Sequence, residues 1–334
     1  MDSLSQLALG SVIGVAVMGR RTAVWKAALW GGIAGTLPDL DALIDYGDPL
    51  RNMTLHRAES HSLFYLTLFS PALALAASKL HGQLLYFKRW WLALWLALVT
   101  HPCLDWMTVY GTQLGIPFVN TPFGLGSIFI IDPIYTLPLL VGVAAALIAR
   151  SDRGLAWNRW GLSLSCAYLL WTAGAQWRVE QIAERSLAQA GIEARQTLAT
   201  PSPFNTVLWR IVAMTSDGYV EGFYSFLDDD TEIRFNQHNS GRMLVPELAH
   251  IPGVERMRWF TRGFYSLSER DGRALVTDLR MGQEPNYVFA FAVGQRGSGF
   301  IEHTPIAVGQ RGDIGRGLAW VWQRLLGNDV PPPR

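Results

Sequence analysis

Uncharged, apolar runs alternate with short polar segments through the first half of the chain, and this pattern predicts a bundle of helices. Four runs are each about 17 residues long, near the minimum for a helix that crosses a hydrocarbon core. Trp and Tyr lie near several of their ends, which is typical of side chains at a membrane interface. The four predicted membrane helices cover residues 62–78, 90–106, 133–149 and 161–177.

Two weaker apolar runs precede these helices, within residues 4–37, and both are rich in Gly and Ala. Each carries a Gly-x-x-x-Gly spacing, which lets two helices pack closely in lipid. We therefore expect a short Gly-rich hairpin whose turn contains Arg20 and Arg21. The spacing falls at Gly10 and Gly14 in the first run and at Gly31 and Gly35 in the second.

After residue 177 the pattern changes to that of a soluble domain. Residues 178–200 are charged and rich in Ala, so we expect a helical connector that ends at Pro201. Beyond it, Ser216-Asp217-Gly218 and Asp271-Gly272 are typical of β-hairpin turns. The predicted strands cover residues 207–215, 219–227, 258–268, 273–279 and 286–293.

The expected fold is an all-α membrane domain of about six apolar segments, the first two a short Gly-rich hairpin, followed by a small, mainly antiparallel β domain. The predicted parts are an integral membrane helical domain with the metal site at 1–177, the helical connector at 178–200, an extramembrane β-rich domain at 201–295 and a C-terminal segment at 296–334 with a disordered, Pro-rich end.

Basic residues are distributed unevenly among the loops, and this asymmetry predicts an orientation. One side of the predicted membrane holds only Arg51 and Arg57, and by the positive-inside rule that side is non-cytoplasmic. We expect an integral protein of a bacterial inner membrane with the C-terminal domain on that side. The opposite side holds Arg20, Arg21, Lys26, Lys79, Lys88, Arg89, Arg150, Arg153 and Arg159.

Composition agrees with a membrane location. Half of the chain is hydrophobic and 16% is charged, whereas roughly 25% is usual for soluble proteins. The formal net charge is +1, so no basic field indicates a nucleic-acid partner. Membrane lipid is the partner that we expect.

Three short motifs carry the candidate chemistry, and each lies at the end of an apolar run on the predicted non-cytoplasmic side. Imidazoles and carboxylates that converge beside a low-dielectric region are costly unless they bind a cation. The sequence therefore predicts a divalent metal site. Its candidate ligands are Asp39 and Asp41, His56 and His61, and His101 and Asp105.

The spacing within each motif predicts its local structure. His101 and Asp105 are one helical turn apart and share a helix face, from which Cys103 points away. Asp39 and Asp41 follow Pro38, which disfavours helix at the residue before it, and in an extended or turn segment the two carboxylates can point the same way.

The spacing of His56 and His61 does not fit one helix face. We therefore expect a loop that leads into a helix, with Ser60 or Ser62 near the N-cap. Glu59, between the two histidines, is the predicted general base, or alternatively a ligand or a partner of a histidine. Arg57 either binds an anionic substrate group or forms a salt bridge with a nearby acid.

Nitrogen and oxygen donors without a thiolate favour Zn²⁺, with Mn²⁺ or Mg²⁺ as alternatives, and six candidate ligands indicate one to three ions. The leading hypothesis is metal-dependent hydrolysis of a phosphoester in a lipid or in another membrane-proximal substrate. A metal or ion transporter is a second class, because carboxylates and histidines beside a membrane also mark ion paths. A structural protein whose metal pins its helices together is a third.

Four segments carry a resemblance to a known family. They are Met1-Asp2-Ser3-Leu4-Ser5-Gln6, Gly35-Thr36-Leu37-Pro38-Asp39-Leu40-Asp41, His56-Arg57-x-x-Ser60-His61-Ser62 and His101-x-x-x-Asp105-x-x-Thr108-x-Tyr110-Gly111-Thr112-Gln113. In combination they resemble the YdjM-like family of membrane-bound metal-dependent hydrolases. The later runs 203–206 and 278–282 are similar to a long-tailed branch of that family.

The resemblance implies a membrane-embedded metal site and hydrolase activity. The family is distantly similar to the helical zinc phospholipase C and single-strand nuclease superfamily, which implies phosphoester chemistry at a multi-metal site. Gln6 stands where many relatives have His, so this difference bears on the number of metal ions. Ala58 and Ser60 stand where many relatives have Gly and Thr.

Overall fold

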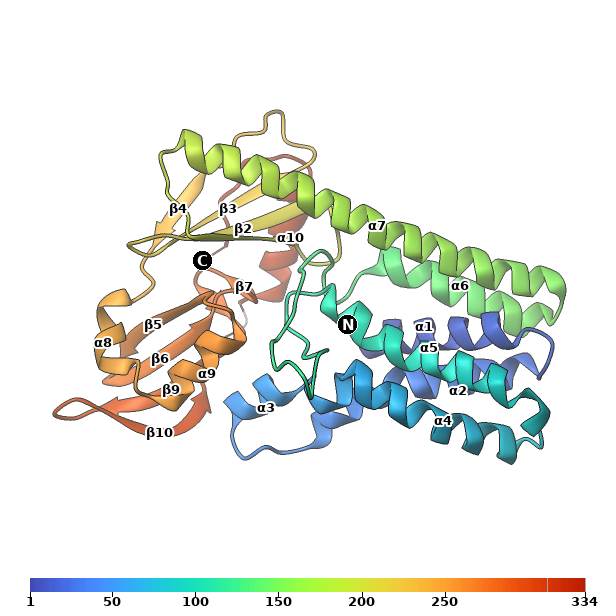
Figure 1. Cartoon of the computed structure of the whole chain (residues 1–334). Helices are drawn as coiled ribbons and strands as arrows, with labels where there is room; N and C mark the ends of the chain where they lie inside the picture. Colours follow the sequence, from blue (N-terminus) through green and yellow to red (C-terminus); the bar gives the residue numbers. More distant parts are fainter. Residues whose placement is uncertain (311, 334) are drawn as a thin grey trace. The chain divides into compact units, whose positions relative to one another are not determined.

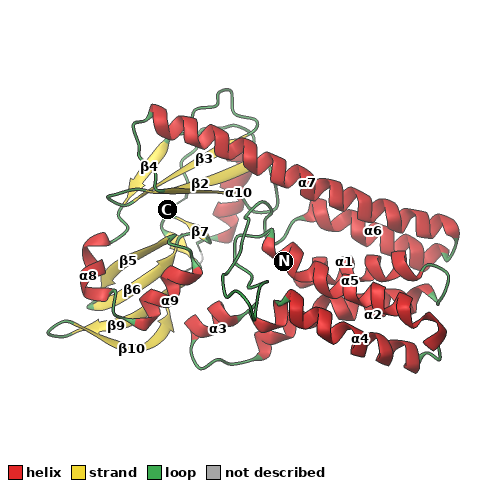
Figure 2. Cartoon of the chain, in the orientation of Figure 1, coloured by secondary structure: helices red, strands yellow, loops and turns green. Residues whose placement is uncertain are grey.

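The computed structural model describes residues 1–310 and 312–333, and the chain divides into two compact units (Figure 1). The helical unit comprises residues 1–44 and 56–173. The β unit comprises residues 45–55 and the chain from Gly174 onward, and it contains all the named strands (Figure 2). A helical N-terminal region followed by an antiparallel β region was predicted, and this arrangement is confirmed.

Each apolar run predicted in the N-terminal half forms a helix. The helices of this region are α1 (Ser3–Met18), α2 (Val24–Thr36), α4 (Leu63–Leu80), α5 (Phe87–Trp106), α6 (Pro133–Ala149) and α7 (Asp152–Gln189). Short 3₁₀ turns lie between them: η1 (Leu37–Leu43), η2 (Glu59–His61) and η3 (Leu84–Tyr86). A further short helix, α3 (Pro49–Leu55), belongs to the β unit.

α1 is the central helix of the helical unit and packs against α2, α5 and α6. Most of its residues are buried, including Ala8, Val12 and Val15, because it is apolar around its whole circumference. The Gly-rich hairpin is confirmed: a Cβ built on Gly10 would lie 2.2 Å from the carbonyl oxygen of Gly31. The two backbones touch where side chains would otherwise separate them.

Only one of the described helices is a clear candidate for crossing a membrane. α4 meets the requirement by length and apolar composition, whereas α1 and α6 are apolar but shorter. The six predicted segments are therefore confirmed as helices, and one of them is a clear candidate for a membrane span.

The predicted helical connector was wrong in its second half. α7 begins at Asp152, runs without a break through the predicted boundary at residue 177, and ends at Gln189. Gly191 then adopts a left-handed backbone conformation (φ +67°), and residues 196–201 form a strand instead of the last turns of a helix. In the β unit α7 buries Val179 and Ile182 against the first sheet.

The β unit contains two four-stranded antiparallel sheets and one short hairpin. The strand order is β1-β2-β3-β4 in the first sheet and β10-β9-β6-β5 in the second, while β7 pairs with β8. The strands are β1 (Gln196–Pro201), β2 (Leu208–Met214), β3 (Tyr219–Ser225), β4 (Phe235–His238), β5 (Tyr265–Arg270), β6 (Arg273–Asp278), β7 (Gly282–Gln283), β8 (Asn286–Tyr287), β9 (Ala290–Arg296) and β10 (Phe300–Ala307). Both predicted hairpins, β2–β3 and β5–β6, are confirmed.

Four further helical segments of this unit were not predicted, and one of them, α9, overlaps a predicted strand. They are η4 (Arg242–Leu244), α8 (Val245–Leu248), α9 (Pro252–Phe260) and α10 (Ile314–Leu325). The expected strand over 258–268 was wrong at its start, because α9 buries Met257 and Phe260 with helical spacing. Of the predicted disordered end, residues 331–333 form neither helix nor strand, and Arg334 lies outside the described residues.

Candidate metal centre

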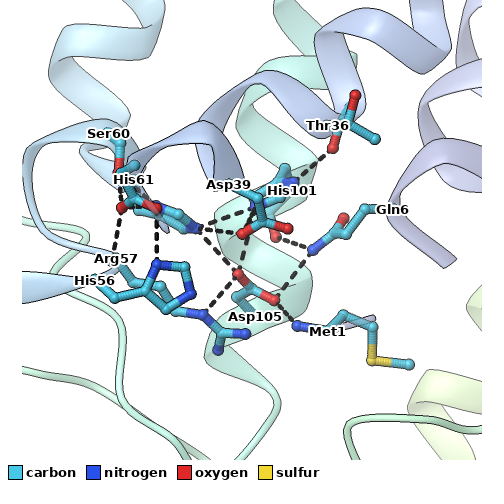
Figure 3. A network of polar contacts seen from close by, with 12 residues as sticks. Met1, Gln6, Thr36, Asp39, His56, Arg57, Ser60, His61, His101 and Asp105 are labelled. Carbon is cyan, nitrogen blue, oxygen red and sulfur yellow. Dashed lines mark hydrogen bonds and ion pairs between the residues drawn. The ribbon is translucent and has the colours of Figure 1, made fainter. Parts of the chain in front are cut away.

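Four side chains from three separate segments converge at one end of the helical unit (Figure 3). Asp39, His61, His101 and Asp105 each offer one ligand atom, and these atoms all lie within 4.8 Å of one another. The side chains of His61, His101 and Asp105 are fully buried, while that of Asp39 is 19% exposed. Because the other three are sealed from solvent, access to the cluster is from the Asp39 side.

Helix ends and short turns position these side chains. His101 and Asp105 lie one turn apart on the last part of α5, as their spacing predicts. His61 is the last residue of η2, and Ser62 is the N-cap of α4, accepting a hydrogen bond from the Tyr65 amide at 3.2 Å. The predicted loop-to-helix junction is therefore confirmed. Asp39 lies on η1, directly after α2.

The donor atoms face one another at hydrogen-bonding or slightly longer distances. Asp39 Oδ1 lies 3.3 Å from His101 Nε2 and 3.5 Å from His61 Nε2. Asp105 Oδ2 lies 3.4 Å and 3.2 Å from the same two nitrogens. The two Nε2 atoms are 3.1 Å apart.

Hydrogen bonds behind the cluster determine which ring nitrogens carry protons. His101 Nδ1 is 2.6 Å from the carbonyl oxygen of Gly35, which can only accept, so this nitrogen donates. Ser60 Oγ donates to Asp41 Oδ2 and must therefore accept from His61 Nδ1, 2.8 Å away. In neutral rings both Nε2 atoms then carry lone pairs that point at each other. A cation between them, or a proton on one ring, relieves the repulsion.

The carboxylate of Asp39 is a second group in the cluster, after the two facing Nε2 atoms, whose hydrogen-bonding capacity is not satisfied. Its Oδ1 is buried, and the potential donors that the structure describes beside it are the Nε2 atoms of His101 and His61, which carry no proton when both rings are neutral. Burial raises the pKa of Asp39, but the neighbouring imidazoles of His101 and His61 lower it more, so the pKa lies well below its usual value. The cluster therefore presents an ionised carboxylate, a second carboxylate from Asp105 and two imidazole nitrogens. Two nitrogens and two oxygens form a donor set that a divalent metal accepts.

The structure places Asp41 and His56 beside the cluster rather than in it. The expectation that Asp39 and Asp41 point the same way was wrong, because η1 is a 3₁₀ turn and residues two apart on it face different directions. Asp41 Oδ1 lies 2.7 Å from His56 Nδ1, and its Oδ2 accepts a hydrogen bond from the Arg57 amide at 2.9 Å. Burial raises the pKa of Asp41, and the His56, Ser60 and Arg57 contacts lower it further than that.

Arg57 forms the salt bridge that was one of its two predicted roles. Its side chain is buried, with Nε 3.2 Å from Asp105 Oδ2 and the guanidinium 4.8 Å from the ring centroid of Tyr110. Its backbone is left-handed (φ +69°).

Glu59, in contrast, is exposed, and its side chain has no hydrogen bond or ion pair with the described part of the chain.

Gln6 is fully buried next to the cluster. Its amide nitrogen donates to Asp105 Oδ1 at 3.1 Å and to the His101 carbonyl oxygen at 3.2 Å, and its Oε1 has no partner among the described residues. The amino group of Met1 also contacts Asp105 Oδ1. Gln6 therefore contacts a candidate ligand directly, so the residue at this position can bear on the number of metal ions, as the resemblance implies.

Sequence reasoning missed two groups that orient the histidines. Ser60 links His61 to Asp41, although it had been considered only as a helix cap. The Gly35 carbonyl orients His101, and a backbone atom leaves no residue-type signal in the sequence. The adjacency of Ser60 to His61 was the available signal, because metal-binding histidines commonly donate their second nitrogen to a fixed acceptor.

A bundle of apolar helices that ends on a buried Asp/His cluster defines a membrane protein with a site that can hold a metal ion. The family model described as YdjM inner membrane protein matches residues 1–179, which is more than half of the chain, and the chain belongs to this family. No curated protein and no solved structure matches the chain.

Proposed function

We propose that this protein is a membrane-bound, metal-dependent hydrolase with Asp39, His61, His101 and Asp105 as its metal ligands. The observation that carries the proposal is the pair of Nε2 atoms 3.1 Å apart, each in a ring whose Nδ1 is already committed to an acceptor. The unpartnered Asp39 Oδ1 points to the same conclusion. Zn²⁺ is the ion that best suits two imidazoles and two carboxylates, with Mn²⁺ or Mg²⁺ as alternatives.

A catalytic rather than purely structural role is supported by the open side of the cluster. Four protein ligands alone would close a zinc site, so a catalytic ion held by all four residues would need a fifth position for water or substrate, which zinc can adopt. Here Asp39 and the neighbouring His56 are 19% and 24% exposed, so solvent reaches this side. When bound, the metal would supply an activated water and a positive charge for a developing oxyanion.

The proton-transfer role has two candidates in this chain. Glu59 is the residue that the sequence indicates, and it is exposed two positions before His61. His56 is the candidate that the geometry favours, because Asp41 holds its Nδ1 and its ring centroid lies 5.9 Å from that of His61. Its Nε2 is left to accept or release a proton.

The substrate that we propose is a phosphoester, in a lipid or in another molecule at the membrane surface. The support is the cluster's position at the end of apolar helices, where a headgroup lies, and the membership in an inner membrane protein family. Arg57 is committed to Asp105, so it stabilises the ligand set and does not bind the anionic group directly.

Metal content and hydrolysis test the proposal together. Purified full-length protein should contain about one equivalent of Zn²⁺ by elemental analysis and should cleave a chromogenic phosphodiester at a rate that a chelator abolishes. His101→Ala should lose the metal and the activity. His56→Ala, the matched histidine outside the four ligands, should keep the metal and lose most of the activity.

Each alternative function has its own result. Folded wild-type protein without metal would overturn the proposal. The cluster would then be a network of ion pairs in which a proton on one imidazole takes the place of the metal ion. Metal-loaded protein without hydrolysis, which unfolds on chelation, would identify a structural metal. Metal flux into proteoliposomes that Asp105→Asn abolishes would identify a transporter. Glu59→Gln separates the two proton-transfer candidates, because it should matter only if Glu59 is the base.

A further inference from the structure

A cavity of about 400 Å³ lies at the end of the helical unit opposite the metal centre. It is formed around the α1–α2 turn and the α6–α7 turn, which Figure 1 shows at the far end of α1 from the N-terminus, whereas Met1 and Gln6 at the near end contact the cluster. Its polar lining includes Arg20, Arg150 and Ser151, and its apolar lining includes Trp25 and Leu155. Cationic and apolar side chains that line one cavity suit an amphiphilic anion.

The charge around this cavity is strongly positive. The two turns and the first residues of α2 and α7 contain five cationic side chains and one carboxylate, that of Asp152. Arg20 donates to Asp152 at 3.0 Å in an exposed pair, which contributes little. Arg150 has no ion pair with any residue that the structure describes. The cationic side chains are Arg20, Arg21, Lys26, Arg150 and Arg153.

Arg150 also has an unusual backbone conformation. Arg150 is the C-cap of α6 and has a left-handed conformation (φ +47°), which a residue with a side chain rarely adopts. Glycine is the usual residue at such a position. The chain instead has an arginine there, whose Nε donates to the Leu147 carbonyl oxygen at 3.4 Å and which is one of the residues that line the cavity.

The apolar part of the cavity distinguishes a lipid from a small anion. Trp25 is 52% exposed, and a half-exposed Trp beside arginines is typical of the headgroup level of a bilayer. Leu147 and Leu155 continue the apolar lining. A free phosphate ion would leave these side chains without a partner, whereas the glycerol and first acyl carbons of a phospholipid would cover them.

We propose that this cavity binds an anionic glycerophospholipid. Arg20 and Arg150 hold the phosphate through charge-assisted hydrogen bonds, and Trp25 and Leu155 contact the beginning of the acyl chains. The site is separate from the metal centre and does not depend on the proposed hydrolase activity. It would anchor the basic end of the helices to the anionic surface of the membrane.

Lipid retention by the full-length protein tests the site. Protein purified in detergent is titrated with dioleoylphosphatidylglycerol or dioleoylphosphatidylcholine, and bound lipid is counted by native mass spectrometry. Wild-type protein should bind phosphatidylglycerol about tenfold more tightly than phosphatidylcholine. The double variant Arg20→Gln/Arg150→Gln should weaken phosphatidylglycerol binding about 25-fold, which corresponds to two arginines at about fivefold each.

The chain offers a matched control on the same surface. Arg21 and Arg153 are neighbours of the two cavity arginines in sequence and do not line the cavity. Arg21→Gln/Arg153→Gln removes the same charge and should change the affinity less than twofold. An equal loss in both double variants would overturn the proposal in favour of diffuse surface charge. Equal binding of the two lipids would also overturn it.

The lipid source and the folding of the variants are checked separately. Inorganic phosphate at the concentration of the lipid should not displace it; displacement would show that the cavity binds a free anion. Trp25→Ala should weaken phosphatidylglycerol binding several-fold, and an unchanged affinity would contradict the acyl contact. Unchanged melting temperatures of both double variants, expected for exposed side chains, exclude misfolding as the cause of a loss.

Discussion

Gly31→Ala adds one methyl group at the closest point between α1 and α2. The new Cβ would lie 2.2 Å from the carbonyl oxygen of Gly10 and 2.9 Å from its carbonyl carbon, whereas ordinary contact begins at 3.4 Å. Both obstructing atoms belong to the backbone, so no side chain can rotate away. The two helices must therefore separate by about 1 Å.

The cost has two parts. Overpacking of this kind destabilises by about 1–3 kcal/mol, and we expect the upper part of that range because two backbones must move. The separation also displaces Gly35, one turn further along α2, whose carbonyl oxygen holds His101 Nδ1 at 2.6 Å. Loss of such an orienting hydrogen bond lowers metal affinity by about 10- to 100-fold.

Two measurements on one variant check both parts. The free energy of unfolding is measured by denaturant titration in detergent micelles, and the zinc dissociation constant by competition with a chromogenic chelator. Gly174→Ala in α7 is the control, since nothing lies within 4 Å of its added Cβ, and it should stabilise by up to about 1 kcal/mol. If Gly31→Ala were as stable as Gly174→Ala, the close contact between α1 and α2 would be refuted.

Three other predictions concern the metal centre. Arg57→Gln removes the guanidinium from Asp105, which keeps the buried Met1 amino group, and should cost up to about 3–5 kcal/mol of unfolding free energy, measured by denaturant titration; a cost below 1 kcal/mol would contradict the ion pair. Asp41 has a lowered pKa in the fold, so its contribution to stability is present above the unfolded pKa of about 3.9 and is lost as the pH falls through the lower folded value. The destabilisation by Asp41→Asn should therefore be constant from about pH 7 to 5 and shrink below about pH 4, and a pH-independent difference would contradict the shift. Zinc at 100 times its Kd should raise the unfolding free energy by about 2.7 kcal/mol in the wild type and by much less in Asp39→Asn, which lacks one ligand charge; equal shifts in a thermal melt would remove Asp39 from the ligand set.

Helix positions in the N-terminal half were predictable from the sequence because apolar runs bounded by charged turns leave few alternatives. The pairing of α1 with α2 was also predictable, since only glycine at every fourth position permits so close an approach. In the β unit, the two Gly-containing turns identified both hairpins. α9 was missed because its helical periodicity is short and merges with the strand-like run that follows.

The position of residues 45–55 could not be predicted from the sequence. Residues 45–55 lie between Asp41 and His56 in sequence, yet they belong to the β unit. Leu50 and Met53 of α3 are buried in that unit, where a Cβ on Gly253 would lie 3.5 Å from Leu50. The sequence of such a short polar segment predicts a loop. The reason is that burying a few side chains against strands far away in the sequence produces no local hydrophobic periodicity.

By itself, the sequence determined which residue types stand at the ends of the apolar helices, and hence the six candidates from which a metal site could be built. Spacing alone also placed His101 and Asp105 on one face of a helix. Only the tertiary structure decided that Asp39 and His61 complete the cluster while Asp41 and His56 lie beside it. The physical reason is that the 3₁₀ geometry of η1 turns neighbouring carboxylates apart, and that the acceptors which orient the two rings are a serine hydroxyl and a backbone carbonyl brought there by helix packing.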